Sequence, residues 1–129
     1  MINTEAFSYI NVLSSAANAS WLRNEAISNN IANATTPGYK RQDVAFEDAL
    51  ARELHGASAR NMDSHVAAVS LRRLNVGTYT DAASFSYRTD GNNVDIENEN
   101  VFLAQNQLKY MGLLNSISSE FENLQNAMK

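Results

Sequence analysis

The residue types that most often carry out chemistry are sparse in this sequence. It contains two histidines, scattered carboxylates and no cysteine, and its serines have no base nearby. His55 and His65 are ten positions apart, whereas two metal ligands on one helical face are spaced by four. Without cysteine there is no thiolate ligand and no thiol nucleophile. The sequence therefore predicts no catalytic residue, no metal and no cofactor.

Two acidic stretches have some features of a calcium-binding loop, Asp90 to Asn93 and Asp95 to Asn100. Such a loop needs oxygen ligands at positions 1, 3 and 5, a glycine at position 6 and a glutamate at position 12. Counted from Asp90, position 5 is Val94 and position 6 is Asp95, so the pattern fails. A turn followed by a helix cap is the better interpretation, because Gly and Asn tolerate positive φ and Asp caps helices well.

Charge and hydropathy exclude further classes of protein. The net charge is −4 and the pI is near 5.0, whereas nucleic-acid binding needs clustered Lys and Arg. Polar Asn and Ser interrupt every apolar run before the roughly 18 residues that a membrane-spanning helix needs. No glycine-rich loop or paired carboxylates indicate a small-molecule substrate. The first residues lack a basic and apolar secretion signal, so we expect any export to use another route.

Residues 1–34 are predicted to form one long N-terminal helix. No Gly or Pro occurs between residues 5 and 34, and residues recur there at spacings of three and four, which is the heptad pattern of coiled coils. The pattern comprises Ile10, Leu13, Ala17, Ser20, Asn24, Ile27, Ile31 and Ala34. Its small residues allow close packing, and a polar seam residue such as Asn24 tends to set register at some cost in stability.

Residues 35–50 follow as a predicted turn and a short extended or helical piece. Pro37 and Gly38 suit the two central positions of a type II turn, because proline fixes φ and glycine accepts positive φ. Residues 51–88 form a variable middle with weaker patterning, for which we expect a loop and short strands. The candidate strands are Val66 to Val69 and Ser84 to Tyr87.

Residues 89–129 are predicted to form a turn and a second long helix capped by Asp95. Its heptad stripe is more apolar than the first, so we expect this helix to anchor the packing. The stripe comprises Leu103, Gln107, Tyr110, Leu114, Ile117, Phe121, Leu124 and Met128. The predicted fold is mainly α, with the two long terminal helices forming a coiled-coil-like pair and a short irregular or β-containing segment between them.

The two stripes allow two interpretations. An amphipathic helix usually packs its apolar face on the core of its own domain. A helix of about 30 residues is about 45 Å long, however, which is more than a short middle segment can cover. We therefore expect the stripes to contact other copies of the chain as well. The predicted subunit-interface residues are Ile10, Leu13, Ala17, Ser20, Asn24, Ile27, Ile31, Leu103, Tyr110, Leu114, Ile117, Phe121 and Leu124.

The stretch from Ser28 to Lys40 resembles the N-terminal signature of bacterial flagellar axial proteins, the family of rod, hook and hook-associated proteins. In that family an Asn-Ile-Ala-Asn core precedes a Thr-Pro-Gly-Tyr-like turn. The matching signature-turn residues are Asn30, Ile31, Ala32, Asn33, Thr36, Pro37, Gly38 and Tyr39. Tyr39 to Glu47, Asp90 to Asp95 and the short length resemble the proximal-rod members of the family.

This resemblance implies a structural subunit of the flagellar basal body, not an enzyme. Such subunits polymerise through their terminal helices into the rod, a helical tube that transmits torque from the membrane ring to the distal rod and hook. The implied partners are further copies of the chain, other rod proteins, the rod-base adaptor, the membrane-ring protein and the type III export apparatus. The implied location is the rod outside the cytoplasmic membrane, reached without a cleaved signal peptide. The alternative is a soluble helical adaptor or secretion chaperone that binds partner helices without polymerising.

Overall fold

The computed structural model of the protein describes residues 5–56, 61–74, 77–81 and 88–129. Two long helices dominate the fold, α1 (Glu5–Ala32) and α4 (Ile96–Ala127). Between them lie β1 (Gln42–Val44), α2 (Phe46–Gly56), α3 (Met62–Ala67) and β2 (Thr78–Thr80). The predicted fold class, mainly α with a long helix at each end and short strands in the middle, is confirmed.

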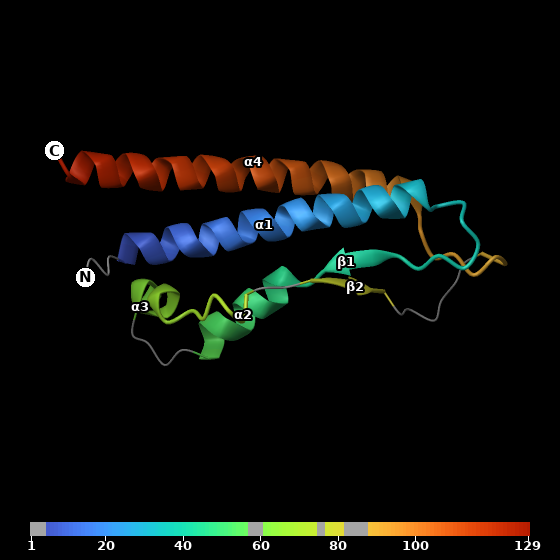
Figure 1. Ribbon diagram of the computed structural model, residues 1–129, viewed down its shortest axis with the longest axis horizontal. Coiled ribbons are helices and arrows are strands. Elements are labelled where there is room, and N and C mark those ends of the chain that lie inside the picture. The colour runs from blue at the N-terminus through green and yellow to red at the C-terminus, as the bar shows by residue number, and fades with distance from the viewer. Residues whose placement is uncertain (1–4, 57–60, 75–76, 82–87) are drawn as a thin grey trace.

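The elements form three layers, with α1 in the centre (Figure 1). α4 runs antiparallel along one side of α1, and α2, α3 and the strands lie along the other side. At one end of the pair, which we call the closed end, residues 33–41 and 88–95 connect the helices to the rest of the chain. Both chain termini lie at the opposite, open end. None of the described helices is long and apolar enough to cross a membrane.

The main apolar core lies between α1 and the middle segment. Ala16 and Ala19 of α1 cluster with Val44, Phe46 and Leu74. Ala17 and Ala26 are also buried on α1, so alanines form much of its covered surface. Because alanine adds little bulk, two layers can approach this helix closely from different sides.

The expectation that the C-terminal helix anchors the packing is wrong. α1 has buried side chains along much of its length, from Ile10 to Asn30. α4 lies entirely within the described residues, yet its buried residues are only Glu99 and Asn106. The physical reason is position, because α1 is covered by two layers and α4 is covered by one.

The stripe predicted for α4 coincides only partly with the side of the helix that is protected from solvent. Its half-buried members are Leu103, Tyr110, Ile117 and Leu124. The members between them, Leu114 and Phe121, are exposed, and the protected residues there are Asn106, Leu113 and Glu120. Because Asn106 and Glu120 are polar, a sequence pattern built on apolar residues does not include them. It includes exposed residues such as Leu114 and Phe121 instead.

The middle segment contains more helix than the sequence predicted. Val66 lies in α3 and Val69 in the turn beyond it, so the strand expected there is wrong. The Asn61 side chain caps α3 by accepting a hydrogen bond from the backbone N–H of Ser64 at 2.9 Å, which favours helix over strand. β1 and β2 pair antiparallel, with Gln42 opposite Thr80. Ser84 to Tyr87 lies outside the described residues.

Candidate assembly surface and the polar clamp beside it

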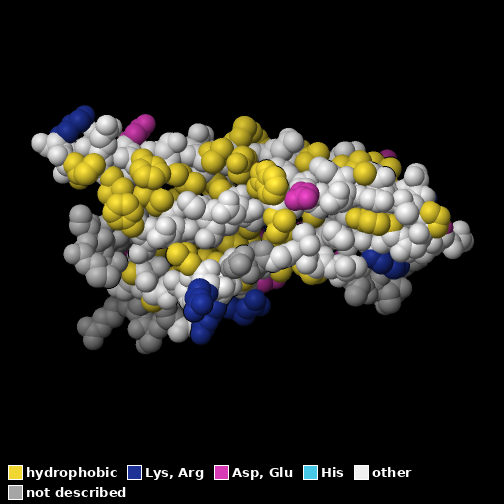
Figure 2. All heavy atoms as spheres, in the orientation of Figure 1, with side chains coloured by type: hydrophobic (Ala, Val, Ile, Leu, Met, Phe, Trp, Pro, Cys, Tyr) yellow, Lys and Arg dark blue, Asp and Glu magenta, His cyan; other side chains and the backbone are white. Residues whose placement is uncertain are grey.

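One side of the α1–α4 pair exposes large apolar side chains, which we call the open flank. Its five residues are Phe7 and Trp21 of α1, Leu114 and Phe121 of α4, and Met128 at the C-cap of α4, all exposed to solvent. On each helix they are seven or fourteen positions apart, and since seven residues make two turns, each set lies on one side of its helix. Phe7, Phe121 and Met128 line one open pocket of about 420 Å³, so the two sets adjoin there. Figure 2 shows apolar side chains gathered along the helix pair, most densely toward the chain termini.

The predicted subunit-interface residues divide into two groups by burial. Ile10, Ala17, Ser20 and Ile27 are buried within the single chain, and Leu13, Asn24, Ile31, Leu103, Tyr110, Ile117 and Leu124 are half-buried. Leu114 and Phe121 are exposed and belong to the open flank. The assignment of these residues to contacts between subunits stays a prediction, and the exposed pair is available for such contacts without rearrangement.

The α1–α4 seam has a polar layer at mid-length. Asn106 of α4 donates to the Ser20 carbonyl at 2.7 Å and to the Asn24 side-chain oxygen at 2.8 Å. Its own Oδ1 is buried without a hydrogen-bond partner among the described residues. Such a layer costs stability and disfavours other pairings of the helices. The sequence indicated Asn24 as the polar seam residue, but not its partner.

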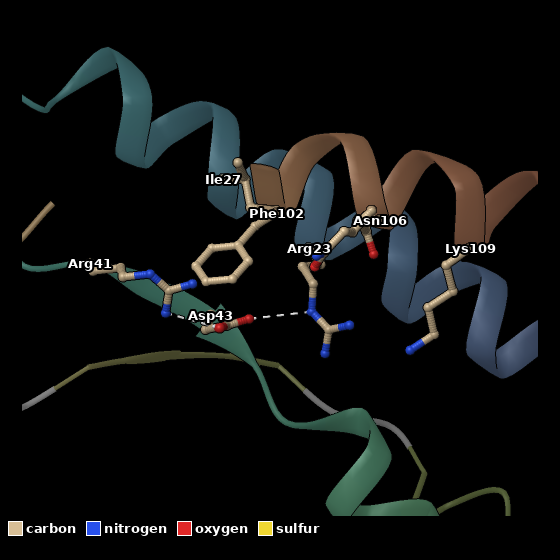
Figure 3. A pocket seen from close by; sticks show the side chains of 8 residues that line it. Arg23, Ile27, Arg41, Asp43, Phe102, Asn106 and Lys109 are labelled. Atoms are coloured by element: carbon tan, nitrogen blue, oxygen red, sulfur yellow. Dashed lines mark hydrogen bonds and ion pairs between the residues drawn. The ribbon is translucent and has the colours of Figure 1, made fainter. Parts of the chain in front are cut away.

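Charged side chains from α1, β1 and α4 meet around a pocket, which Figure 3 shows from close by. An open cavity of about 270 Å³ there is lined by Arg23, Arg41, Asp43, Phe102, Asn106 and Lys109, among others. Arg23 donates to Glu47 at 2.7 and 2.5 Å and to Asp43 at 3.3 Å, and Lys109 also pairs with Glu47. The hydrogen bonds from Arg23, with a further contribution from Lys109, lower the pKa of Glu47 from 4.5 to about 2. These ion pairs join all three layers.

The signature turn leaves α1 in the predicted geometry. The Thr36 carbonyl accepts a hydrogen bond from the Tyr39 backbone N–H at 3.3 Å, and Gly38 has a φ of +72°. Positive φ at the second central position is what a type II turn requires. Of the other predicted signature residues, Ile31 and Ala32 end α1 and the Asn33 side chain donates to the Asn29 carbonyl at 2.8 Å.

Asn30 and Glu99 form the centre of a buried polar cluster at the closed end. The Asn30 side chain exchanges two 2.8 Å hydrogen bonds with the Gln42 backbone and donates to Glu99 at 3.0 Å. Glu99, which is 1% exposed, accepts from Arg41 Nε at 2.5 Å. Tyr39 donates to Asn30 at 3.2 Å, and burial together with the Glu99 charge raises the pKa of Tyr39. The cluster joins α1, β1 and α4 at the level of the signature turn.

Residues 33–41 and 88–93 are hydrogen-bonded to each other at several points, and we call this contact the clamp. The Gly38 backbone N–H donates to the Asp90 carbonyl at 2.9 Å, and the Lys40 ammonium donates to the Gly91 carbonyl at 2.6 Å. The Arg41 backbone N–H donates to the Asn93 side chain at 2.7 Å. The clamp therefore joins the two segments that the sequence singled out separately.

Sequence reasoning missed most of these polar residues. It gave no role to Arg23 or Asn106, treated Asn92 only as part of a turn, and did not place Glu99 in a buried ion pair. No group of three or more His, Asp or Glu residues in the described parts of the chain is arranged to hold a metal ion. The signal that could have found Asn92 is its place in the Asp90 to Asp95 segment, which was recognised only as a turn.

Comparison with known proteins places this arrangement in a family. Residues 10–40 match the family described as "Flagella basal body rod protein". The flagellar basal body rod protein FlgB of Bacillus subtilis is 32% identical over 116 residues, which cover 90% of this chain and 89% of the relative. FlgB of Borreliella burgdorferi is 31% identical over 129 residues, covering 94% and 90% of the two chains. FlgB of Escherichia coli K12 is 28% identical over 114 residues, covering 83% of each.

The chain therefore belongs to the flagellar basal body rod proteins, and more narrowly to their FlgB family. This confirms the resemblance seen in the signature turn and in the Asp90 to Asp95 segment.

Proposed function

We propose that this structural protein of the flagellar basal-body rod polymerises through its terminal helices into the tube of the proximal rod, which passes torque from the membrane ring to the distal rod and hook. Family membership supports a structural role and the basal-body location. The observation that carries the mode of assembly is the open flank, because five large apolar residues follow one side of a long helix pair. Apolar patches of this extent mark contact surfaces.

The surface area of the chain supports the same conclusion. The chain exposes 8601 Å². A compact monomer of its mass, 14.2 kDa, exposes about 6,800 Å². The excess of about 1,800 Å² reflects the elongated shape of the chain, which leaves more surface open to contacts than a compact monomer has.

The exposed residues of α4 supply a second contact surface beside the open flank. Val101, Leu108 and Met111 are at least half exposed and lie within the first half of the helix. When one patch of a copy meets a different patch of the next copy, the contact repeats without closing unless the rotation forms a ring. Two distinct apolar patches on each copy therefore suit a helical tube.

The proposed partners are neighbouring copies, the other rod proteins, the rod-base adaptor and the membrane-ring protein. Passage through the type III export apparatus belongs to the same proposal, as does the absence of a catalytic role. The alternative remains a helical adaptor or secretion chaperone, which would use the open flank to hold one partner helix in a closed complex. Polymerisation distinguishes the two.

The test is electron microscopy and sedimentation of concentrated protein, alone and mixed with other rod proteins. Wild-type protein should form tubes or ordered aggregates. Leu114→Glu and Phe121→Glu should raise the concentration needed for assembly about tenfold or more, because each loses an apolar contact of about 1.5–3 kcal/mol. Asn123→Glu is the matched control, since it adds the same charge at an exposed position of α4 that is fourteen residues from Lys109 and lies outside both apolar patches. Closed complexes of fixed size at all concentrations would favour the adaptor.

A further inference from the structure

Asn92 binds the turn that follows α1, from which it is distant in sequence. Its side-chain amide donates to the carbonyls of Asn33 at 2.9 Å, Ala34 at 3.1 Å and Thr36 at 2.9 Å. Those carbonyls belong to the turn that follows α1, which ends at Ala32. The last carbonyls of the helix itself, those of Asn29, Asn30 and Ile31, accept from the backbone N–H groups of Asn33 and Ala34, the residues that come directly after it. Asn92 therefore holds the turn beyond the helix, from a position 56 to 59 residues further along the chain.

The surroundings of Asn92 hold its side chain in one orientation. The residue is fully buried, at 0% exposure. Its Oδ1 accepts from the Val94 backbone N–H at 2.7 Å, and its own backbone N–H donates to the Asp90 side chain at 3.1 Å. Beside it, Gly38 and Gly91 face each other, and a Cβ added to Gly91 would lie 3.7 Å from the Gly38 Cα. Both glycines have positive φ, so the two turns meet through residues that lack side chains.

The apolar residues of the seam do not define a single register for α1 and α4. Heptad patterns repeat every seven residues, so sliding one helix by that amount again opposes seam positions to seam positions. Polar contacts remove this ambiguity. They are the Asn106 layer at mid-length, the Asn30–Glu99 pair and the bonds from Asn92 to the turn after α1, and the last two lie together at the closed end.

We propose that Asn92 is a positioning residue that selects one register of the α1–α4 pair by binding the turn that follows α1. These hydrogen bonds fix the exit of α1 against the segment that leads into α4, which begins four residues after Asn92, at Ile96, with Asp95 as its N-cap. One register then aligns the α1 and α4 halves of the open flank. Only this last step rests on the proposed function, because the register itself is a property of the single chain.

Disulfide trapping can test the register because the chain has no native cysteine. Asn106 lies between Ser20 and Asn24, at the level of Leu22. Counting eight residues from there along each antiparallel helix reaches Ser14 and Leu114. Ser14→Cys would be combined in turn with each of three cysteines on α4. Leu114→Cys reports the native register, and Gln107→Cys and Phe121→Cys report a slide by one heptad in either direction.

With Asn92 intact, the Leu114 cysteine should give most of the cross-linked product. Asn92→Asp keeps the shape of the side chain and its acceptor but removes the donors, and it should lower the ratio of native to slid product about tenfold or more. Asn92→Ser is a milder variant that keeps an oxygen for the Val94 N–H. Asn93→Asp is the matched control, because it makes the same change one residue away and loses only the bond to the Asp81 carbonyl. Amide exchange at the Gly38 N–H should become faster in both Asn92 variants.

An unchanged ratio among the three products in Asn92→Asp and Asn92→Ser would overturn the proposal. So would a uniform loss of all three products with the ratio preserved, since that is the result of lower stability alone. A shifted ratio in Asn92→Ser, with the Asn93→Asp ratio unchanged, supports it. If the ratio shifts while the wild-type protein forms no ordered assembly, the proposed function fails and the register role of Asn92 stands.

Discussion

Arg23 joins α1 to the middle layer of the molecule through one guanidinium group. It reaches the Val44 carbonyl at 2.5 Å and the carboxylates of Asp43 and Glu47, while Lys109 of α4 contacts Glu47 from its other side. Hydrogen bonding to Glu47 is the largest cause of the raised pKa of Arg23, so this cation keeps its charge at every pH at which the protein folds. Acid that protonates Glu47 therefore removes its ion pairs with Arg23 and Lys109.

Acid should remove the contribution of Glu47 to stability. Because the folded-state pKa of Glu47 is about 2, below its ordinary 4.5, its ion pairs stabilise the fold above pH 4.5 and are lost as pH falls toward 2. Solvent screens this half-exposed group, so the effect is smaller than the pKa alone implies. Melting temperatures of wild type and Glu47→Gln between pH 2 and 6 should converge at the acid end.

Asp48→Asn is the control for this experiment. Asp48 is the exposed neighbour of Glu47 on α2 and makes no ion pair with the described residues, so its replacement should change the melting temperature little at any pH. A gap between wild type and Glu47→Gln that stays constant across the pH range would show that the carboxylate does not act through these ion pairs.

At the scale of elements, the turn after α1 depends on one glycine. Gly38 has positive φ, and a Cβ there would meet nothing within 4 Å, so substitution acts through backbone strain alone. Gly38→Val should cost about 1–2 kcal/mol of unfolding free energy, since β-branched residues resist positive φ. Urea denaturation measures this cost. Rod assembly should be impaired as well, because the clamp begins at this residue.

Gly112→Ala also replaces a glycine that has room for a side chain, but it should raise the stability of the protein instead of lowering it. Gly112 lies within α4, where an added Cβ also meets nothing within 4 Å, so alanine should stabilise the helix by about 0.5–1 kcal/mol. If Gly38→Val were as stable as wild type and assembled normally, the turn would not have the role given to it.

The elements that could be predicted from the sequence are those with local signals. Pro37 and Gly38 ended α1 close to the observed boundary, and Asp95 capped α4 as expected. α3 was missed although its Asn61 cap is a local signal. The seam of α4 was predicted only in part, because its determinants are not local. Asn106 and Glu99 are polar residues whose hydrogen-bond partners lie on α1. The residue pattern of α4 alone does not show that these partners exist, so it cannot predict that the two side chains are buried.

For the molecule as a whole, a thin layered fold with an exposed apolar flank should be incompletely ordered when alone. Circular dichroism of dilute protein should show clearly less helix than α1 and α4 together contain, because helices rich in Asn and Ser depend on packing. Helix content should rise when assembly begins at higher concentration. A dilute monomer that is fully helical and melts cooperatively would instead indicate an autonomous domain.

The central position of α1 also determines which of its residues can be substituted during evolution. Covered by α4 and by the middle segment, and lined by alanines, α1 can exchange residues freely only at exposed positions such as Asn18 and Glu25. Most of α4 has no such constraint from its own chain, since the single copy covers so little of it. Selection on α1 thus acts through the fold of each molecule, whereas in the proposed assembly selection on α4 would act largely through neighbouring subunits, so the two helices should diverge under different pressures.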